Sequence, residues 1–359
     1  MACQLLDLFP ESTNRPVLCK ALLRLSRASD LHPTCFPLFG LQKLEQQVAA
    51  GAFGDIWKSR LRGQSVSVKM MRIFRDADIK AVLKEFGREA LIWRQLSHPN
   101  LLPFYGLYYV ENRLCLVSPW MESGHILDFL KNAPSDTNRV SLILDIALGL
   151  EHLHKERILH GDLKGMNILV TPSGRACIAD FGLSTMTDVM TLRFTHSTAN
   201  SHGGTARYQA PELLLGESLN HFGSDVYAFA CVCYEILIGK VPFFELPNDM
   251  AVSLKVIGGH RPSRPSSTPV DDGLWRLLQD CWQHASEERP TIAQIVQKLV
   301  NPEIGAETDQ TATDWDETLS SKFRRSLQHS PLLPSVTEIE NRISGDGVCC
   351  FFISPCIHE

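Results

Sequence analysis

An acid, a lysine and an amide stand close together in the segment 160–167, as Asp162, Lys164 and Asn167, and a second acid, Asp180, follows. A phosphoryl-transfer site needs this combination. One carboxylate accepts or orients the proton of the attacking hydroxyl, and a cation neutralises phosphate charge. An amide oxygen and another carboxylate are hard ligands suited to Mg²⁺. The order of these residues therefore indicates phosphoryl transfer.

The segments around these groups have the pattern of positioning elements. Apolar residues 168–170 follow the polar loop and predict a short buried strand, whereas the spacing over 140–154 predicts a helix that leads into it. Upstream, a β-branched run ends in Lys69. A buried ammonium needs a partner, and Glu89, in a predicted helix over 80–96, is the candidate. A strand-end lysine in solvent is the commoner arrangement, so the residues alone leave this pair open.

Two glycines, Gly51 and Gly54, lie between short extended segments. Glycine at a strand turn lets backbone N–H groups approach phosphates because no Cβ stands in the way. A plain β-hairpin explains two glycines equally well, so this pair alone decides nothing.

Taken in order, these motifs resemble those of the protein kinases. Residues 160–167 resemble the catalytic loop H-R-D-x-K-x-x-N, and Asp180 opens a D-F-G motif. Residues 66–69 are similar to V-A-I-K and residues 49–56 to the glycine-rich loop, while A-P-E ends at Glu212. The resemblance spans about 260 residues, from Leu41 to Val300. It implies an α+β bilobal fold: an antiparallel N-terminal sheet with one helix, a mainly helical C-terminal lobe, and a hinge near 119–121.

The resemblance also implies a role for each matched residue, with ATP and Mg²⁺ as cofactors. The residues expected to act in the transfer are Asp162, Lys164, Lys69, Glu89 and Thr205. The residues expected to bind the nucleotide are Val48, Ala49, Gly51, Gly54, Ile56, Lys69, Ser118, Pro119, Met121 and Leu169. Asn167 and Asp180 are expected to hold Mg²⁺. Lys69 would pair with Glu89, Asp225 would brace the catalytic loop, and Arg289 would pair with Glu212.

The choice of substrate hydroxyl follows from the same comparison. Lys164 together with Thr205 is similar to serine/threonine kinases, and the Cys281-Trp282 pair followed by Arg289 resembles their tyrosine-kinase-like group. The wording His-Gly-Asp-Leu-Lys-Gly resembles the expanded kinases of mushroom-forming fungi. The expected activity is transfer of the ATP γ-phosphate to protein Ser and Thr hydroxyls in intracellular signalling.

Three positions depart from the family pattern. Ala49 replaces the first glycine of the glycine-rich loop, and Pro119 stands where the hinge usually carries glutamate. Gly161 replaces the arginine that receives the activation-loop phosphate in many kinases. We therefore hypothesise that the active shape depends less on phosphorylation of residues 184–201.

Two rival functions remain open. A pseudokinase or scaffold would need a broken site, yet the lysine, the acids and the amide are all present. A small-molecule phosphotransferase is suggested by His-Gly-Asp with a later Asn, as in aminoglycoside and choline phosphotransferases. Lys164 and the docking loop, residues 204–212, argue against it because that loop serves polypeptide substrates.

Composition bounds the remaining questions. The net charge of −5 and 44% hydrophobic residues argue against nucleic-acid binding and favour a globular protein. Eleven scattered cysteines indicate reduced thiols, so we expect a cytoplasmic or nuclear protein without a signal peptide or membrane span. We expect an N-terminal extension over 1–37, a kinase domain over 38–300 and a disordered tail over 301–359. Membrane contact would come only through S-acylation of the terminal cysteines.

Overall fold

The structure is a computed structural model. It describes residues 38–70 except 43, 52 and 53, residues 89–110, 113–186 except 183, 205–264 and 270–301, and short pieces near both ends of the chain. The chain forms two compact units. The N-terminal unit comprises residues 1–97, 103–120 and 315–359, and the C-terminal unit comprises 98–102 and 121–314.

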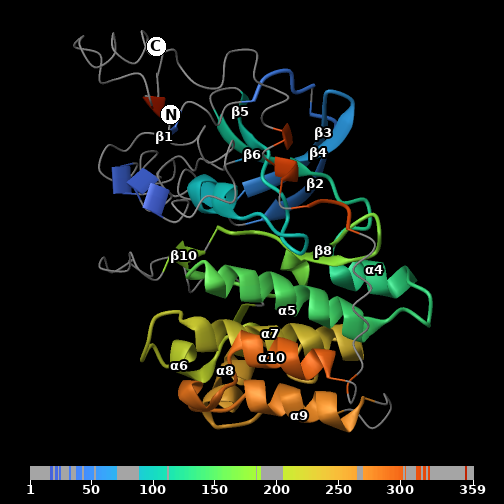
Figure 1. The fold of residues 1–359 in the computed structure, drawn as a ribbon. Helices are drawn as coiled ribbons and strands as arrows, with labels where there is room; N and C mark the ends of the chain where they lie inside the picture. The colour runs from blue at the N-terminus through green and yellow to red at the C-terminus, as the bar shows by residue number, and fades with distance from the viewer. Residues whose placement is uncertain are drawn as a thin grey trace. The chain divides into compact units, whose positions relative to one another are not determined.

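The N-terminal unit is built on a five-stranded antiparallel sheet with strand order β2-β3-β4-β6-β5 (Figure 1). The strands are β2 (Gln46–Gly51), β3 (Gly54–Leu61), β4 (Gln64–Met70), β5 (Gly106–Val110) and β6 (Arg113–Pro119). Arg62 and Gly63, both at positive φ, form the two-residue turn between β3 and β4. Such turns match the twist of a hairpin, which explains why these strands pair in register.

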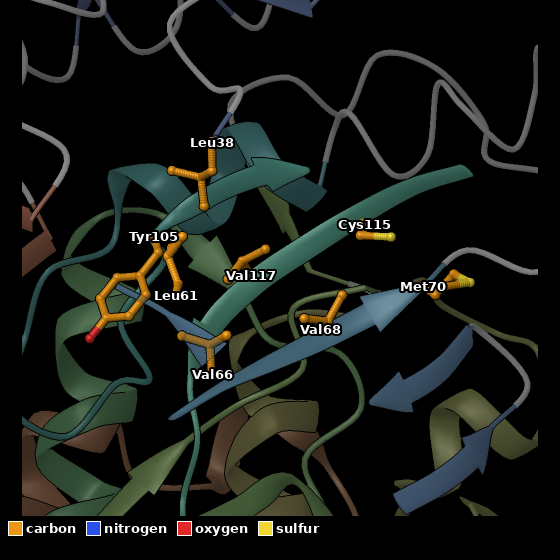
Figure 2. Close-up of a cluster of buried hydrophobic side chains, with 8 residues drawn as sticks. All are labelled: Leu38, Leu61, Val66, Val68, Met70, Tyr105, Cys115 and Val117. Atoms are coloured by element: carbon orange, nitrogen blue, oxygen red, sulfur yellow. The ribbon is translucent and has the colours of Figure 1, made fainter. Parts of the chain in front are cut away.

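One face of this sheet carries an apolar cluster (Figure 2). In β4 the buried residues Val66, Val68 and Met70 alternate with less buried Ser67 and Lys69, which is the period of a strand with one face in the core. The cluster consists of Leu38, Leu61, Val66, Val68, Met70, Tyr105, Cys115 and Val117. The alternation directs the apolar side chains to the core and leaves the Lys69 side chain on the opposite face of β4.

The C-terminal unit is mainly helical (Figure 1). Its α-helices are α4 (Ile126–Asn132), α5 (Arg139–Lys155), α6 (Pro211–Leu214), α7 (Phe222–Ile238), α8 (Asp249–Ile257), α9 (Asp272–Cys281) and α10 (Ile292–Val300). Its short strands are β7 (Ile158–Leu159), β8 (Ile168–Val170), β9 (Ala176–Ile178) and β10 (Thr185–Met186), and its 3₁₀ turns are η1 (Gly165–Asn167), η3 (Thr205–Tyr208) and η4 (Ser286–Glu288). The predicted α+β kinase architecture is confirmed.

Helix α7 is the centre of this unit. Residues 224–236 are all buried, and the helix packs against α5, α9 and the turn η3. The helix begins at Phe222, two residues before Ser224. The Ser224 hydroxyl lies inside the first turn and accepts a hydrogen bond from the His221 N–H at 2.9 Å. The Ser224 side chain therefore provides an acceptor for a backbone N–H at the N-terminus of α7, as in a capping box.

Part of the C-terminal tail is folded onto the N-terminal unit. Trp315 is 7% exposed and Ser320 is buried, while the ring of Phe323 stacks on Tyr105 with centroids 3.8 Å apart. Phe323 also packs against the cluster of Figure 2. Within the range 301–359, for which we expected disorder, the described Phe323 ring therefore packs on an apolar surface. Farther along, β11 (Phe352–Ile353) pairs antiparallel with β1 (His32–Pro33).

A search of the described residues finds no helix with both the length and the apolar character needed to cross a membrane.

The folded tail segment makes a testable prediction. Phe323→Ala should lower the free energy of unfolding by about 1–3 kcal/mol, because it removes a stacked, partly buried ring. Urea unfolding measures this. Lys322→Ala is the matched control, since the Lys322 side chain is 61% exposed. Equal stability of wild type and Phe323→Ala would show that the segment is not docked.

Candidate active site

An ion pair joins β4 to the helical segment 89–95. The Lys69 ammonium donates to Glu89 Oε1 at 2.8 Å, and the two side chains are 13% and 4% exposed. The predicted pair is therefore confirmed. Because both charges are largely removed from water, loss of either partner would leave an uncompensated charge, so the pair fixes where the ammonium stands.

Packing alone explains one of the glycines in the β2–β3 hairpin. A Cβ on Gly54 would lie 2.5 Å from the backbone oxygen of Met70, so only glycine fits beside the end of β4. Gly51 pairs with Gly54, and Ala49 with Ile56. The residues between the two glycines lie outside the described part of the chain. The nucleotide contacts assigned to Val48, Ala49, Gly51, Gly54 and Ile56 stay predictions.

The predicted hinge follows β6. Ser118 is buried and Pro119 pairs with Val66 of β4, while the Trp120 N–H donates to the Ser65 carbonyl at 3.2 Å. The two units divide between Trp120 and Met121 along the chain.

Met121 and Leu169 belong to the C-terminal unit. The Met121 carbonyl accepts a hydrogen bond from the Gly124 N–H at 3.1 Å, which uses one of its two lone pairs. Leu169 is partly buried on β8, where it pairs with Cys177. Adenine binding by Ser118, Pro119 and Met121 stays a prediction, as does the apolar wall at Leu169.

The catalytic loop brings three of the predicted residues together. The Lys164 ammonium donates to Asp162 Oδ2 at 2.6 Å, and Asn167 Nδ2 donates to the Asp162 carbonyl at 2.8 Å. Because Nδ2 is committed to the loop, Asn167 Oδ1 is the atom left to act as a ligand. The Lys164 ammonium thus lies beside the Asp162 carboxylate, and the Asn167 side chain stabilises the conformation of the loop from 162 to 167.

Asp180 lies next to this loop in a strained conformation. The Ala179 N–H donates to the Asn167 carbonyl at 2.8 Å. Asp180 directly follows Ala179, so its backbone lies close to that of Asn167. Asp180 has φ +63°, in the left-handed region that non-glycine residues rarely adopt. The surroundings must hold this strain, and such strain concentrates at functional sites.

The buried side chain of His160 bonds both to the catalytic loop and to the segment just before Asp180. Its Nδ1 accepts the Asp162 N–H at 3.3 Å, so the ring proton lies on Nε2, which donates to the Ala179 carbonyl at 3.1 Å. The side chain is completely buried. His160 is therefore a structural residue, held by hydrogen bonds at both ring nitrogens.

Asp225 on α7 holds the start of the loop. Its Oδ2 accepts the His160 N–H at 2.9 Å and its Oδ1 accepts the Gly161 N–H at 3.0 Å, while His154 Nε2 lies 3.1 Å from Oδ2. Burial raises the pKa of Asp225, but the hydrogen bonds and charge of His154 outweigh burial and hold the pKa below its usual value. The predicted bracing role is confirmed.

The backbone conformation at position 161 favours glycine. It has φ +80°, which glycine adopts at no steric cost. Residues 187–204 lie outside the described part of the chain, as does the Thr205 side chain. The hypothesis about activation-loop phosphorylation and the role of Thr205 therefore stay predictions.

One supporting acid was missed from the sequence. Asp145 of α5 is fully buried and accepts from Arg175 Nε at 2.8 Å and from the Ala176 N–H at 2.9 Å. It thereby anchors the β8–β9 hairpin that leads to Asp180. The available signal was a single acid in the apolar run of residues 142–147.

A second buried ion pair closes the docking loop. Arg289 donates from both terminal nitrogens to the two oxygens of Glu212, each at 2.7 Å. Burial raises the pKa of Glu212, but the hydrogen bonds from Arg289 and His221 outweigh it and lower the pKa to about 2. The predicted Glu212–Arg289 pair is confirmed.

Comparison with known proteins agrees with this site. The family model described as protein tyrosine and serine/threonine kinase matches residues 42–299. Serine/threonine-protein kinase STY46 of Arabidopsis thaliana is 31% identical over 300 residues, covering 80% of this chain and 49% of the relative. Serine/threonine-protein kinase STY17 of the same plant is 32% identical, covering 72% of this chain and 44% of the relative. The chain spans about half the length of these relatives.

The Glu212–Arg289 pair predicts a specific acid sensitivity. The unfolded-state pKa of Glu212 is near 4.5 and its folded pKa is about 2, so its stabilising contribution is complete above pH 4.5 and is lost as the pH falls towards 2. Glu212→Gln should therefore unfold more easily at neutral pH by about 3–5 kcal/mol and lose less stability on acidification. Urea unfolding at several pH values measures both effects. Glu217→Gln, at an exposed position, is the control; parallel pH curves for wild type and Glu212→Gln would contradict the assignment.

Proposed function

Because the chain belongs to the family of protein tyrosine and serine/threonine kinases, we propose that it transfers the γ-phosphoryl group of ATP to Ser and Thr hydroxyls of proteins. The observation that carries this proposal is the geometry of the catalytic loop, in which Asp162, Lys164 and Asn167 are held together by hydrogen bonds. The relatives, which are named serine/threonine kinases, support the choice of hydroxyl.

The donor set fits a magnesium ion. Asn167 Oδ1 and the Asp180 carboxylate are hard oxygen ligands, and the backbone bond from Ala179 to Asn167 keeps the two residues in adjoining segments. When bound with ATP, Mg²⁺ neutralises charge on the phosphate oxygens. The two residues would hold the ion, and the strained backbone at Asp180 would aim its carboxylate.

The residues of the chain would share the remaining work. Asp162 would accept or orient the proton of the substrate hydroxyl, and Lys164 beside it would stabilise negative charge on the transferred group. In the N-terminal unit Lys69, held by Glu89, would contact the α- and β-phosphates, as the family pattern implies. Catalysis would then rest on positioning and electrostatic stabilisation.

Two features argue against the rival functions. The groups that a pseudokinase would lack are present: Lys69 is paired with Glu89 in the N-terminal unit, and Lys164 is paired with Asp162 in the C-terminal unit. Lys164, in turn, distinguishes the loop from those of small-molecule phosphotransferases. A cytoplasmic or nuclear site of action follows from the composition and belongs to the same proposal.

The proposal is tested by phosphoryl transfer from Mg²⁺-ATP to the protein itself and to a generic Ser/Thr substrate. Asp162→Asn and Lys69→Met should each lower turnover at least about a hundredfold, because each removes a group that acts on the reacting phosphate or hydroxyl. Asp136→Asn makes the same chemical change as Asp162→Asn at an exposed turn and should leave turnover unchanged. Phosphate should appear on Ser or Thr; a folded wild type that binds ATP without transferring phosphate would support the scaffold instead.

A further inference from the structure

The face of the N-terminal sheet opposite the Lys69 side chain is shielded from water. Antiparallel sheets commonly leave one face solvated. On this face, however, every member of the cluster of Figure 2 is at most 6% exposed. Two of the residues that pack there come from outside the sheet: Leu38, before β2, and Phe323, in the C-terminal tail. A residue beyond the predicted domain end at 300 therefore helps to cover the sheet.

The Phe323 ring contacts the N-terminal unit at Tyr105. The two rings are stacked, with centroids 3.8 Å apart and planes inclined by 18°. The Tyr105 N–H donates to the Val117 carbonyl of β6 at 2.9 Å, and Val117 pairs with Val68 of β4. Tyr105, Val117 and Val68 are all members of the cluster. The tail is thus linked to β4 through one stacked ring and one strand pairing.

This ring belongs to a segment with an ordered conformation of its own. We call the described residues of 315–323 the tail segment. Thr318 donates from its N–H and its hydroxyl to Asp316 Oδ1 at 2.8 and 2.6 Å, and the Lys322 ammonium donates to Asp316 Oδ2 at 3.1 Å. Asp316 and Lys322 are exposed, whereas Ser320 is buried. The tail segment therefore has a buried side and a solvated side.

The position of Lys69 depends on the same cluster. Its two neighbours along β4, Val68 and Met70, are both cluster members, whereas its own side chain lies on the other face and pairs with Glu89 at 2.8 Å. Because strand residues alternate between faces, the packing of Val68 and Met70 sets the point from which the Lys69 side chain extends. Loosening the cluster would therefore displace Lys69 without any direct contact to it.

We propose that the tail segment is an activating element that acts within the chain. When it is docked on the sheet, it holds β4 so that Lys69 is positioned for the phosphates of ATP, and when it leaves, nucleotide affinity falls. This inference rests on the proposed function, in which Lys69 contacts the α- and β-phosphates. Phe323 is then a positioning residue, because its ring packs on the cluster and Lys69 lies on the opposite face of β4.

Docking and nucleotide binding must then favour each other by the same factor. If ATP binds more tightly when the tail segment is docked, bound ATP must also stabilise the docked state. A coupling of about fivefold is at the lower end of the usual range for linked sites and is large enough to measure. In the wild type, saturating Mg²⁺-ATP should therefore slow amide hydrogen exchange in residues 318–323 about fivefold.

The first test is the Kd of Mg²⁺-ATP, measured by calorimetry on the full chain. Phe323→Ala should raise this Kd about fivefold, because it removes the stacked ring that keeps the tail segment docked. In a turnover assay the KM for ATP should rise likewise, while kcat at saturating ATP stays within about twofold of wild type. Phe39→Ala makes the same chemical change at an exposed position of the N-terminal unit and should leave these values unchanged.

A second pair of variants releases the tail segment by a different route. Ser320→Asp places a charge at a side chain that is 4% exposed, and an unpaired buried charge is costly, so this variant should raise the Kd as Phe323→Ala does. Ser320→Ala introduces no charge and should bind ATP as the wild type does. Agreement between Phe323→Ala and Ser320→Asp separates undocking from a local effect of either substitution.

An unchanged Kd in folded Phe323→Ala and Ser320→Asp, or exchange in residues 318–323 that Mg²⁺-ATP does not slow, would overturn the inference. If neither variant folds, the wild-type exchange measurement decides. A wild type that binds ATP without transferring phosphate contradicts the proposed kinase activity, and the Kd comparison still decides this inference. A wild type that binds no ATP overturns both.

Discussion

The buried carboxylate of Asp225 is the contact on which the rest of the site depends. Its two oxygens hold consecutive backbone N–H groups of the catalytic loop, at His160 and Gly161. A loop has no hydrogen-bond ladder of its own, so its shape must come from outside. Here the support comes from α7, in which residues 224–236 are all buried.

Further hydrogen bonds position the catalytic groups relative to this contact. The His160 ring bonds to the Ala179 carbonyl, just before Asp180, and the Asn167 side chain bonds to the Asp162 carbonyl within the loop. Asp145 holds the adjoining hairpin by the same means, with a buried carboxylate on backbone N–H. Each of these links is a hydrogen bond to a backbone group, so together they fix the conformation of the loop that carries Asp162 and Lys164. In the N-terminal unit, strand pairing positions the Lys69 backbone, and the ion pair with Glu89 positions the Lys69 ammonium.

The sequence predicted the parts of the site that carry chemistry, because those residues must occur as particular types in a particular order. Lys69 with Glu89, the loop at 160–167 and the Glu212–Arg289 pair were all predicted in that way. Their supports were harder to predict. Asp145 is a single acid in an apolar helix, and its partners are an arginine and a backbone N–H about 30 residues farther along the chain, which no spacing rule encodes.

Tertiary context also decided the remaining differences. Composition predicted disorder for the tail, but composition cannot show that the Phe323 ring packs against an apolar cluster of the N-terminal unit. The glycine at 54 was correctly noted, but its structural reason, the closeness of Met70, was visible only in three dimensions.

The most direct test of this account joins loop order to turnover in Asp225→Asn. Amide exchange at His160 and Gly161 and kcat should be measured on the same preparations. The account predicts faster exchange at both amides and a fall in kcat of at least about tenfold, because the loop loses its charged acceptor while Asp162 itself is unchanged. Unchanged exchange with full turnover, or lost turnover with both amides still protected, would contradict the claim that Asp225 holds the active site in place.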